Sequence, residues 1–128
     1  MQDKQLYEYA VLRLVPRVER EEFINVGVIL YCSGRQFLSV KYELNPARLG
    51  AFGCNVDPVE IQAYLLAFKQ ICQGRRDGGV IGALPLSSRF RWLTATRSTM
   101  LQTSKVHAGF CEDPEHTLSV LFNEQVLC

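Results

Sequence analysis

The chain of 128 residues has little net charge, few histidines and no long apolar run. Its formal net charge is +1 at pH 7, so the basic excess that usually accompanies non-specific nucleic-acid binding is absent, although a local basic patch stays open. No apolar stretch reaches the length of a membrane-spanning helix, and no charged segment followed by an apolar one marks a secretory leader. We therefore expect a cytoplasmic protein without a membrane-spanning segment.

Cysteine and histidine do not occur in metal-binding or disulfide patterns. The cysteines are odd in number, widely scattered and without a C-x-x-C pair, and the only histidines are His107 and His116. This distribution is typical of reduced, mostly buried thiols rather than of a disulfide framework or a zinc site. We expect no metal and no other cofactor. The cysteines are Cys32, Cys54, Cys72, Cys111 and Cys128.

The sequence contains no complete catalytic motif. The glycine-rich segment 78–82 lacks the G-x-x-x-x-G-K-[ST] pattern of a phosphate-binding loop. His107 precedes a small residue and a glycine, a position that suits a general base, but no serine nucleophile elbow accompanies it. A hydrogen-bonded structural histidine is the better interpretation. These absences favour a protein that is not an enzyme.

The composition provides ample material for a folded core. Hydrophobic residues make up 48% of the chain and charged residues 21%, which are values typical of globular proteins. A chain of this length buries a core without disulfides or metals. Because no internal repeat, low-complexity segment or linker interrupts the sequence, we expect residues 1–128 to form one globular α+β domain.

Three extended runs predict the first strands of a sheet. They extend from Tyr7 to Val15, from Phe23 to Cys32 and from Gln36 to Leu44. The first run is apolar on both sides, which is typical of a central strand covered on both faces. Ser33-Gly34 indicates a hairpin, because glycine tolerates positive φ at a turn. We expect these runs to form an antiparallel start to the sheet.

Two helix starts are marked by an aspartate before a proline. Asp57-Pro58 precedes apolar residues at helical spacing, and Gly74 follows them as a stop, so the pattern predicts one long helix. Asp113-Pro114 predicts a C-terminal helix in the same way. The apolar stripe of the long helix is interpreted as core rather than as a cofactor site. Its members are Ile61, Tyr64, Leu65, Phe68, Ile71 and Cys72.

Weaker signals mark the segments between these elements. An asparagine before a proline predicts a short helix over 47–52, and the segment 80–84 is a candidate short strand. Residues 87–93 suit one or two helical turns, and 97–106 a strand or extended segment. The predicted fold is α+β, with a single antiparallel or mixed β-sheet packed with one long helix and a C-terminal helix.

The first candidate site lies where the first two runs meet. Arg13 lies within the first run, and Glu22 and Asn25 open the second. Because buried polar groups need partners, Arg13 and Glu22 are interpreted either as a structural ion pair between the strands or as part of a binding site. The ion pair is favoured narrowly, and Gly27 is expected to let another backbone approach closely.

The second candidate site interleaves arginines with aromatic residues between 89 and 109. A guanidinium beside an aromatic face can hold an acidic group, a base or a phosphate. Buried aromatics with arginine stems along the surface explain the same residues, and we favour this structural interpretation. If the segment binds an anion, His107 would add a proton-dependent contact to the donors of the segment, which are Arg91, Arg97, Ser98 and Ser104.

Several separated motifs together resemble a known family. They are, in chain order, Tyr7-x-Tyr9-x-x-x-Arg13-x-x-Pro16, Glu22-x-x-Asn25-x-Gly27-Val28, Phe90-x-Trp92, Arg97-Ser98 and Val106-His107-x-Gly109. The chain resembles a family of small bacterial proteins known only as a domain of unknown function. The resemblance implies no activity. It implies a stand-alone bacterial cytoplasmic protein, often encoded beside a HipA-like, toxin-related kinase, and thus a partner or regulator of that kinase.

Two functional hypotheses follow. The first is a non-enzymatic binding or regulatory protein that acts through protein contacts, and a homo-oligomer is compatible with it. The second is a ligand-binding domain or enzyme for an anionic, nucleotide-like or phosphorylated substrate. Convergence of the candidate side chains in one cleft would separate the two hypotheses. The candidate ligand-binding residues are Arg13, Glu22, Asn25, Arg97, Ser98 and His107.

Overall fold

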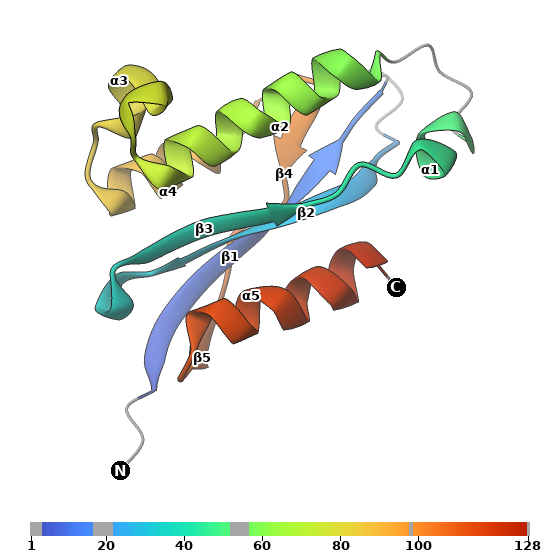
Figure 1. Ribbon diagram of the computed structural model, residues 1–128. Coiled ribbons are helices and arrows are strands. Elements are labelled where there is room, and N and C mark those ends of the chain that lie inside the picture. The colour runs from blue at the N-terminus through green and yellow to red at the C-terminus, as the bar shows by residue number, and fades with distance from the viewer. Residues whose placement is uncertain (1–3, 17–21, 52–56, 98, 128) are drawn as a thin grey trace.

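The computed structural model describes residues 4–16, 22–51, 57–97 and 99–127. Its centre is a five-stranded sheet with helices on both faces (Figure 1). The strand order is β3-β2-β1-β4, β5 also pairs with β1, and every pairing is antiparallel. The predicted α+β fold, with one long helix and a C-terminal helix on an antiparallel sheet, is confirmed.

The predicted antiparallel start of the sheet is confirmed by the pairing of the first three strands. A 3₁₀ turn over Ser33–Arg35 joins the second strand to the third, and Gln36 after it has a φ of 50°. The left-handed position of this hairpin is therefore Gln36, whereas the sequence pointed to Gly34. The strands are β1 (Gln5–Leu14), β2 (Ile24–Cys32) and β3 (Phe37–Tyr42).

Two short strands, β4 (Leu101–Thr103) and β5 (His107–Cys111), pair with the other edge of β1. Between them, Ser104 is buried, and its backbone N–H donates to the carbonyl of Val11 at 2.8 Å. Its hydroxyl accepts the N–H of Val11 at 2.9 Å, so a side chain replaces a strand carbonyl in the ladder. The sequence predicted a single extended segment over 97–106 and did not predict β5.

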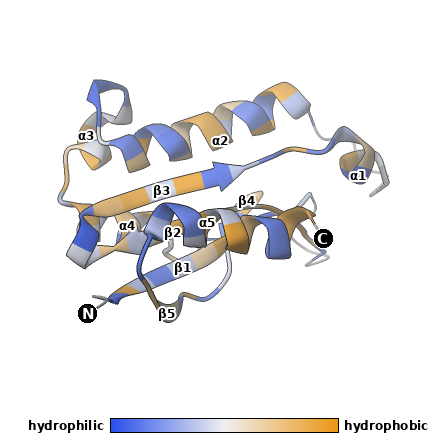
Figure 2. Cartoon of the chain, turned by 60° about the horizontal axis from the view of Figure 1, so that its bottom comes forward, coloured by the Kyte–Doolittle hydropathy of each residue, from blue (hydrophilic) through white to orange (hydrophobic). Residues whose placement is uncertain are grey.

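Helices cover the two faces of the sheet separately (Figure 1). The long helix α2 (Pro58–Gln73) and α4 (Leu86–Leu93) pack on one face, and α5 (Pro114–Phe122) packs on the other. In Figure 2, both α2 and α5 alternate between hydrophobic and hydrophilic residues, as helices with one buried side do. A short helix, α1 (Pro46–Ala51), follows β3.

The segment 80–84 begins in a helix and ends in a turn, so the predicted short strand is wrong. α3 (Gly79–Gly82) packs against α2 and α4 rather than beside a strand of the sheet. Its backbone is satisfied locally, because Ala83 N–H donates to the Val80 carbonyl at 3.2 Å and Leu84 N–H donates to the Ile81 carbonyl at 3.1 Å. Without a neighbouring strand edge, local hydrogen bonds decide the conformation.

The predicted helix boundaries rest on capping contacts. The Asp57 carboxylate accepts the N–H of Val59 at 2.9 Å, and the Asp113 carboxylate accepts the N–H of Glu115 at 3.1 Å. Gly74 ends α2 with a φ of 69°, the left-handed conformation that favours glycine. The predicted starts of α2 and α5 and the predicted end of α2 are confirmed. Sequence patterns could predict them because the capping contacts join residues that are close in sequence.

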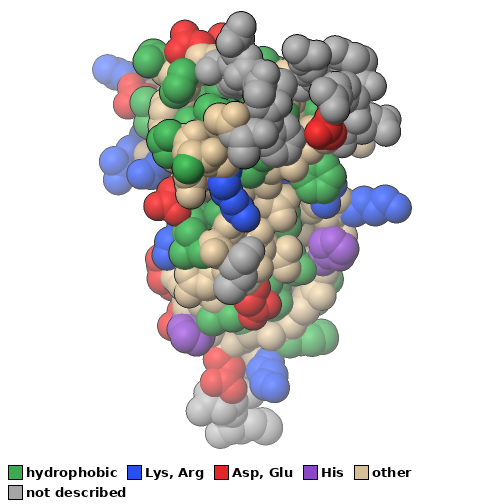
Figure 3. All heavy atoms as spheres, turned by 90° about the vertical axis from the view of Figure 1, so that its right-hand side faces the viewer, with side chains coloured by type: hydrophobic (Ala, Val, Ile, Leu, Met, Phe, Trp, Pro, Cys, Tyr) green, Lys and Arg blue, Asp and Glu red, His purple; other side chains and the backbone are tan. Residues whose placement is uncertain are grey.

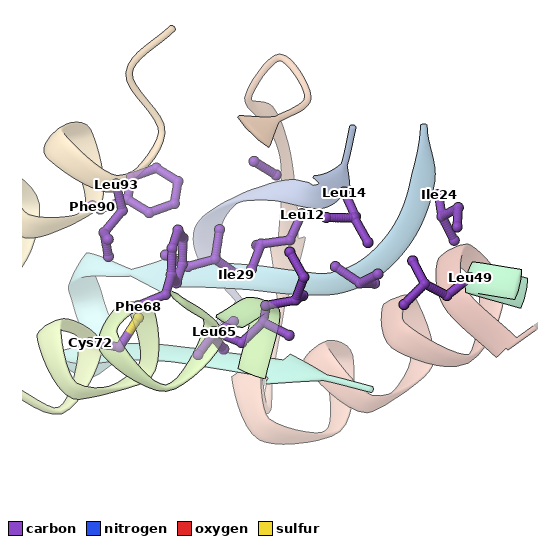
Figure 4. Close-up of a cluster of buried hydrophobic side chains, with 14 residues drawn as sticks. Leu12, Leu14, Ile24, Ile29, Leu49, Leu65, Phe68, Cys72, Phe90 and Leu93 are labelled. Carbon is purple, nitrogen blue, oxygen red and sulfur yellow. The ribbon is translucent and has the colours of Figure 1, made fainter. Parts of the chain in front are cut away.

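Buried residues form two clusters, one on each face of the sheet. Figure 4 shows the first, in which side chains of α2 and α4 meet those of β1 and β2. The second lies beneath α5 and includes Val28, Leu30, Cys32, Cys111, Leu118, Leu121, Phe122 and Val126. β1 thus contributes to a core on each side, as its apolar sequence predicted.

A β-bulge in β2 decides which residues face each cluster. Leu12 pairs with Gly27, but the next residue, Arg13, pairs with Asn25, so Val26 is the extra residue. The bulge reverses the alternation of the strand. Ile24 and Val26 belong to the cluster under α2, whereas Val28, Leu30 and Cys32 belong to the cluster under α5.

Gly27 stands beside the bulge with no space for a side chain. A Cβ at this position would lie 2.8 Å from the carbonyl oxygen of Lys41 and 2.8 Å from the Cβ of Tyr42 on β3. The close approach of another backbone, which the sequence suggested, is therefore present. A larger residue would push β3 away from β2.

The described cysteines are free and buried. Burial raises the pKa of the Cys72 thiol to about 12, and the positive charge of Arg89 offsets only part of this rise. Cys72 therefore stays protonated at neutral pH and packs as a small hydrophobe. Cys54 and Cys128 lie outside the described residues.

We predict that Gly27→Ala lowers the free energy of unfolding by about 1–3 kcal/mol, because the new methyl group overpacks the β2–β3 contact. Gly50→Ala is the matched control. Nothing lies within 4 Å of a Cβ at Gly50 in α1, so alanine there should raise stability by about 0.4–1 kcal/mol. Urea unfolding of both variants checks the pair. Equal stability of the two variants would contradict the close approach at Gly27.

Candidate functional site

Arg13 and Asn25 face each other on neighbouring strands, at the bulge. The guanidinium carbon of Arg13 lies 4.2 Å from the centre of the Phe23 ring, which holds the side chain in place. The Nε atom of Arg13 is buried and has no hydrogen-bond partner among the residues that the structure describes.

The side-chain amide of Asn25 uses its donor group but not its acceptor in hydrogen bonds. Its Nδ2 donates to the carbonyl of Gln125 at 3.0 Å, which fixes the orientation of the amide. Its Oδ1 is buried and accepts no hydrogen bond from any described residue. Arg13 and Asn25 thus leave one buried donor and one buried acceptor unsatisfied, although groups of this kind are nearly always paired in folded proteins. Glu22 is exposed, and its proposed pairing with Arg13 stays a prediction.

Arg97 lies on the opposite face of the sheet, after α4. Its Nη1 donates to the carbonyl of Leu93 at 3.2 Å, and its Nη2 donates to the carbonyl of Trp92. Its guanidinium carbon also lies 4.3 Å from the centre of the Trp92 ring. Arg97 thereby adds charged donors to carbonyls at the end of α4, where a positive charge is also favourable.

His107 is exposed at the start of β5 and pairs with Tyr9 of β1. The two rings lie 5.3 Å apart between their centres. Tyr9 and Arg13 share a face of β1, but they are four positions apart along the strand, a distance of roughly 13 Å. The structure therefore brings Arg13 and Asn25 together and leaves Arg97 and His107 in two other places. Ser98 lies outside the described residues.

A pocket of about 330 Å³ opens between α2 and the chain that runs from α4 into β4. Tyr64 and Trp92 stand at it with exposed fractions of 45% and 42%, which leave much aromatic surface in contact with water. The remaining lining is mainly apolar. The lining residues are Tyr64, Ala67, Phe68, Ile71, Trp92, Leu93, Ala95, Arg97, Thr99, Met100, Leu101, Gln102 and Thr103.

Polar contacts hold the exposed aromatic residues of this pocket in position. The hydroxyl of Tyr64 donates to Glu60 at 2.8 Å, and this hydrogen bond raises the pKa of Tyr64. Trp92 carries the Arg97 guanidinium on its ring. The sequence assigned Tyr64 to the core because it shares the helical spacing of the apolar stripe. The spacing of apolar residues shows which side of the helix faces the sheet, but it does not show where the sheet beneath the helix ends.

A second, smaller pocket of about 120 Å³ lies beside Asn25, between α1 and the π-helical turn Asn123–Leu127. Its lining carries both charge signs, in Glu43 and Arg48. The Nη1 of Arg48 donates to the carbonyl of Val126 at 2.8 Å, so this guanidinium supports the end of the described chain. The charged group of Arg48 is thus used to hold this turn in place.

The charged surface is mixed in sign. On the side shown in Figure 3, the described Lys and Arg side chains stand apart, with Asp and Glu among them. Arg91 of α4 pairs with Glu8 of β1 at 2.7 Å. Within the described ranges, no group of His, Cys, Asp or Glu side chains could hold a metal ion. None of the helices described there combines the length and apolar character needed to cross a bilayer.

The fold and the pocket define a small α+β protein with an open, mainly apolar pocket beside a helix. The chain belongs to the family described as a protein of unknown function, DUF3037, whose model matches residues 9–126. The resemblance that the motifs indicated is thereby confirmed as membership of a domain of unknown function. Neither the curated proteins nor the solved structures contain a match to the chain.

We predict that Arg13→Met leaves the free energy of unfolding within about 1 kcal/mol of the wild type. Methionine keeps the apolar stem and removes the unsatisfied Nε–H, and this relief offsets the lost contact with Phe23. Chemical unfolding measures the difference. A buried ion pair at Arg13 would instead cost about 3–5 kcal/mol when broken, so a loss of that size would contradict the prediction.

Arg89→Met is the positive control for this measurement. Its guanidinium donates to the carbonyls of Leu84, Ile71 and Cys72 at distances of 2.8–3.1 Å. The same substitution there leaves those carbonyls without their charged donor, and we expect it to cost about 1.5–3 kcal/mol.

Proposed function

We propose that the protein is a non-enzymatic binding protein whose pocket between α2 and β4 receives an apolar side chain of a partner protein. One observation carries this proposal: an open, mainly apolar pocket of about 330 Å³ with exposed Tyr64 and Trp92 at its side. Aromatic surface is unfavourable in contact with water. An apolar group that binds against it removes this surface from water and so lowers the free energy.

The residue types at the pocket support protein recognition. Tyrosine, tryptophan and arginine are the residues that most often dominate the binding energy of protein interfaces. Here Tyr64, Trp92 and Arg97 lie around one recess, and internal hydrogen bonds restrain Tyr64 and Arg97 before any partner arrives. Restrained side chains lose little conformational entropy on binding.

The charge at the pocket indicates the chemistry of the partner. Arg97 is the charged residue of the lining, and the lining contains no aspartate or glutamate among the described residues. A partner segment with an apolar side chain beside an acidic residue complements this arrangement. The family resemblance points to a HipA-like kinase as the partner and to a regulatory, toxin–antitoxin-associated role in a bacterial cytoplasm, and we include both in the proposal.

The test is a binding titration between the purified chain and a HipA-like kinase from the native host, the partner that the proposal names. We expect Tyr64→Ala and Trp92→Ala each to weaken binding by about tenfold to thirtyfold, because truncation of a central aromatic residue costs about 1.4–2 kcal/mol. Isothermal titration calorimetry gives the affinities, and circular dichroism checks that each variant is folded.

Leu66→Ala is the matched control, because Leu66 lies on the same helix, is 48% exposed and is not part of the pocket lining. It should bind as the wild type does. Failure of the wild-type chain to bind the kinase would reject the kinase as partner. Binding that is equally strong in the wild type and the pocket variants would reject the pocket.

An anion-binding site at Arg13 is the second candidate function. The observation that favours it is the pair of unsatisfied buried atoms, Arg13 Nε and Asn25 Oδ1, on adjacent strands. A polar group that is kept without a partner costs stability, and such costs are often associated with function. A guanidinium fixed on an aromatic ring is suited to a phosphate or carboxylate.

Titration with a panel of nucleotides and phosphorylated metabolites tests this candidate. We expect at least one compound of the panel to bind the wild type. Its affinity should fall about tenfold or more in Arg13→Met, since hydrogen bonds to charged groups contribute about 1.5–3 kcal/mol. Arg91→Met, which removes an exposed guanidinium on α4, should leave the affinity unchanged. Absence of binding across the panel, or equal losses in the two variants, would remove this candidate.

A further inference from the structure

The sheet has an exposed apolar pair at the end where β1 begins. Leu6 and Phe110 are cross-strand partners on β1 and β5, with exposed fractions of 52% and 70%. They lie on the same side as Glu8, which α4 reaches through the ion pair with Arg91. The cover provided by α4 thus ends at Glu8, and the sheet beyond it is open to solvent.

The outer edge of β5 is also unoccupied by a strand in the described part of the chain. β5 pairs with β1 on one side, and its other side has no strand partner there. Such an edge presents backbone N–H and carbonyl groups that can pair with another strand. An exposed apolar pair beside a free edge is the combination on which sheets extend between molecules.

We propose that two copies of this chain associate through β5, in an antiparallel pairing about a two-fold axis at Gly109. This interface lies apart from the pocket between α2 and β4. Pairing about Gly109 sets residues 108 and 110 of the two copies opposite each other. Phe110 of one copy then meets the small Ala108 of the other and has room to lie beside Leu6, twice in the dimer.

The charges at the two ends of β5 support a second copy as the occupant. Lys105 precedes the strand, and Glu112 and Asp113 follow it, and all are exposed. In the antiparallel arrangement, Lys105 of one copy comes beside Glu112 and Asp113 of its partner. Symmetry repeats this contact, so opposite charges meet at both ends of the interface. Parallel pairing of the same strands would bring like charges together.

Sedimentation equilibrium of the full chain at several protein concentrations tests the proposal. We expect a reversible dimer for the wild type and a monomer for Phe110→Arg, because the substitution places two charges of the same sign near the axis. The fold itself should persist, because the Phe110 side chain is largely exposed. Val80→Arg, at an 85% exposed position on α3, is the matched control and should dimerise as the wild type does.

A charge reversal tests the orientation of the strands. Lys105→Glu should weaken the dimer by about tenfold or more, since pairing about Gly109 then sets a carboxylate opposite Asp113 and beside Glu112 of the partner. Adding Asp113→Asn, which keeps an oxygen to cap α5, removes the facing charge and should recover part of the affinity. A monomeric wild type at every concentration would overturn the proposal. So would a dimer that survives Phe110→Arg, or a double variant weaker than Lys105→Glu alone.

Discussion

The β-bulge at Val26 is the constraint on which the arrangement of both cores depends. A regular β2 would send Ile24 and Val26 to the side of Val28 and Leu30, and one helix layer would lose part of its apolar support. The bulge also turns Asn25 towards Arg13 and the C-terminal turn. A single extra residue thus decides the packing of the sheet and the position of its unsatisfied polar groups.

Side-chain donors complete the ends of the helices. Arg89 holds carbonyls at the end of α2, Arg97 holds those at the end of α4, and Asn25 and Arg48 hold carbonyls of the π-helical turn. These arginines are therefore engaged within the fold. Arg13 differs from them, because its guanidinium lies on the Phe23 ring and its Nε has no acceptor among the described residues. This difference, rather than the number of arginines, makes Arg13 the stronger candidate for an external ligand.

Local signals predicted much of the fold. Asp57 and Asp113 before prolines predicted both main helices, because capping involves residues two or three positions apart. The bulge and β5 depend on register between distant segments, and no local pattern of residues encodes that register. The site was predicted less well. The sequence placed Arg13, Glu22 and Asn25 in one candidate site. It also joined them to Arg97 and His107, because alternation alone does not assign a residue after a helix to one face of the sheet.

The order of the strands bears on how the chain folds as it is synthesised. β1 comes first in the sequence and lies at the centre of the sheet, but the residues that complete its second edge come last, as in the contact of Val11 with Ser104, 93 residues apart. The β1–β2–β3 unit can pair early, whereas the other edge of β1 must wait for most of the chain. A nascent chain therefore presents an apolar strand with an open edge until β4 and β5 emerge. During that interval the chain is most exposed to wrong pairing and most in need of a chaperone.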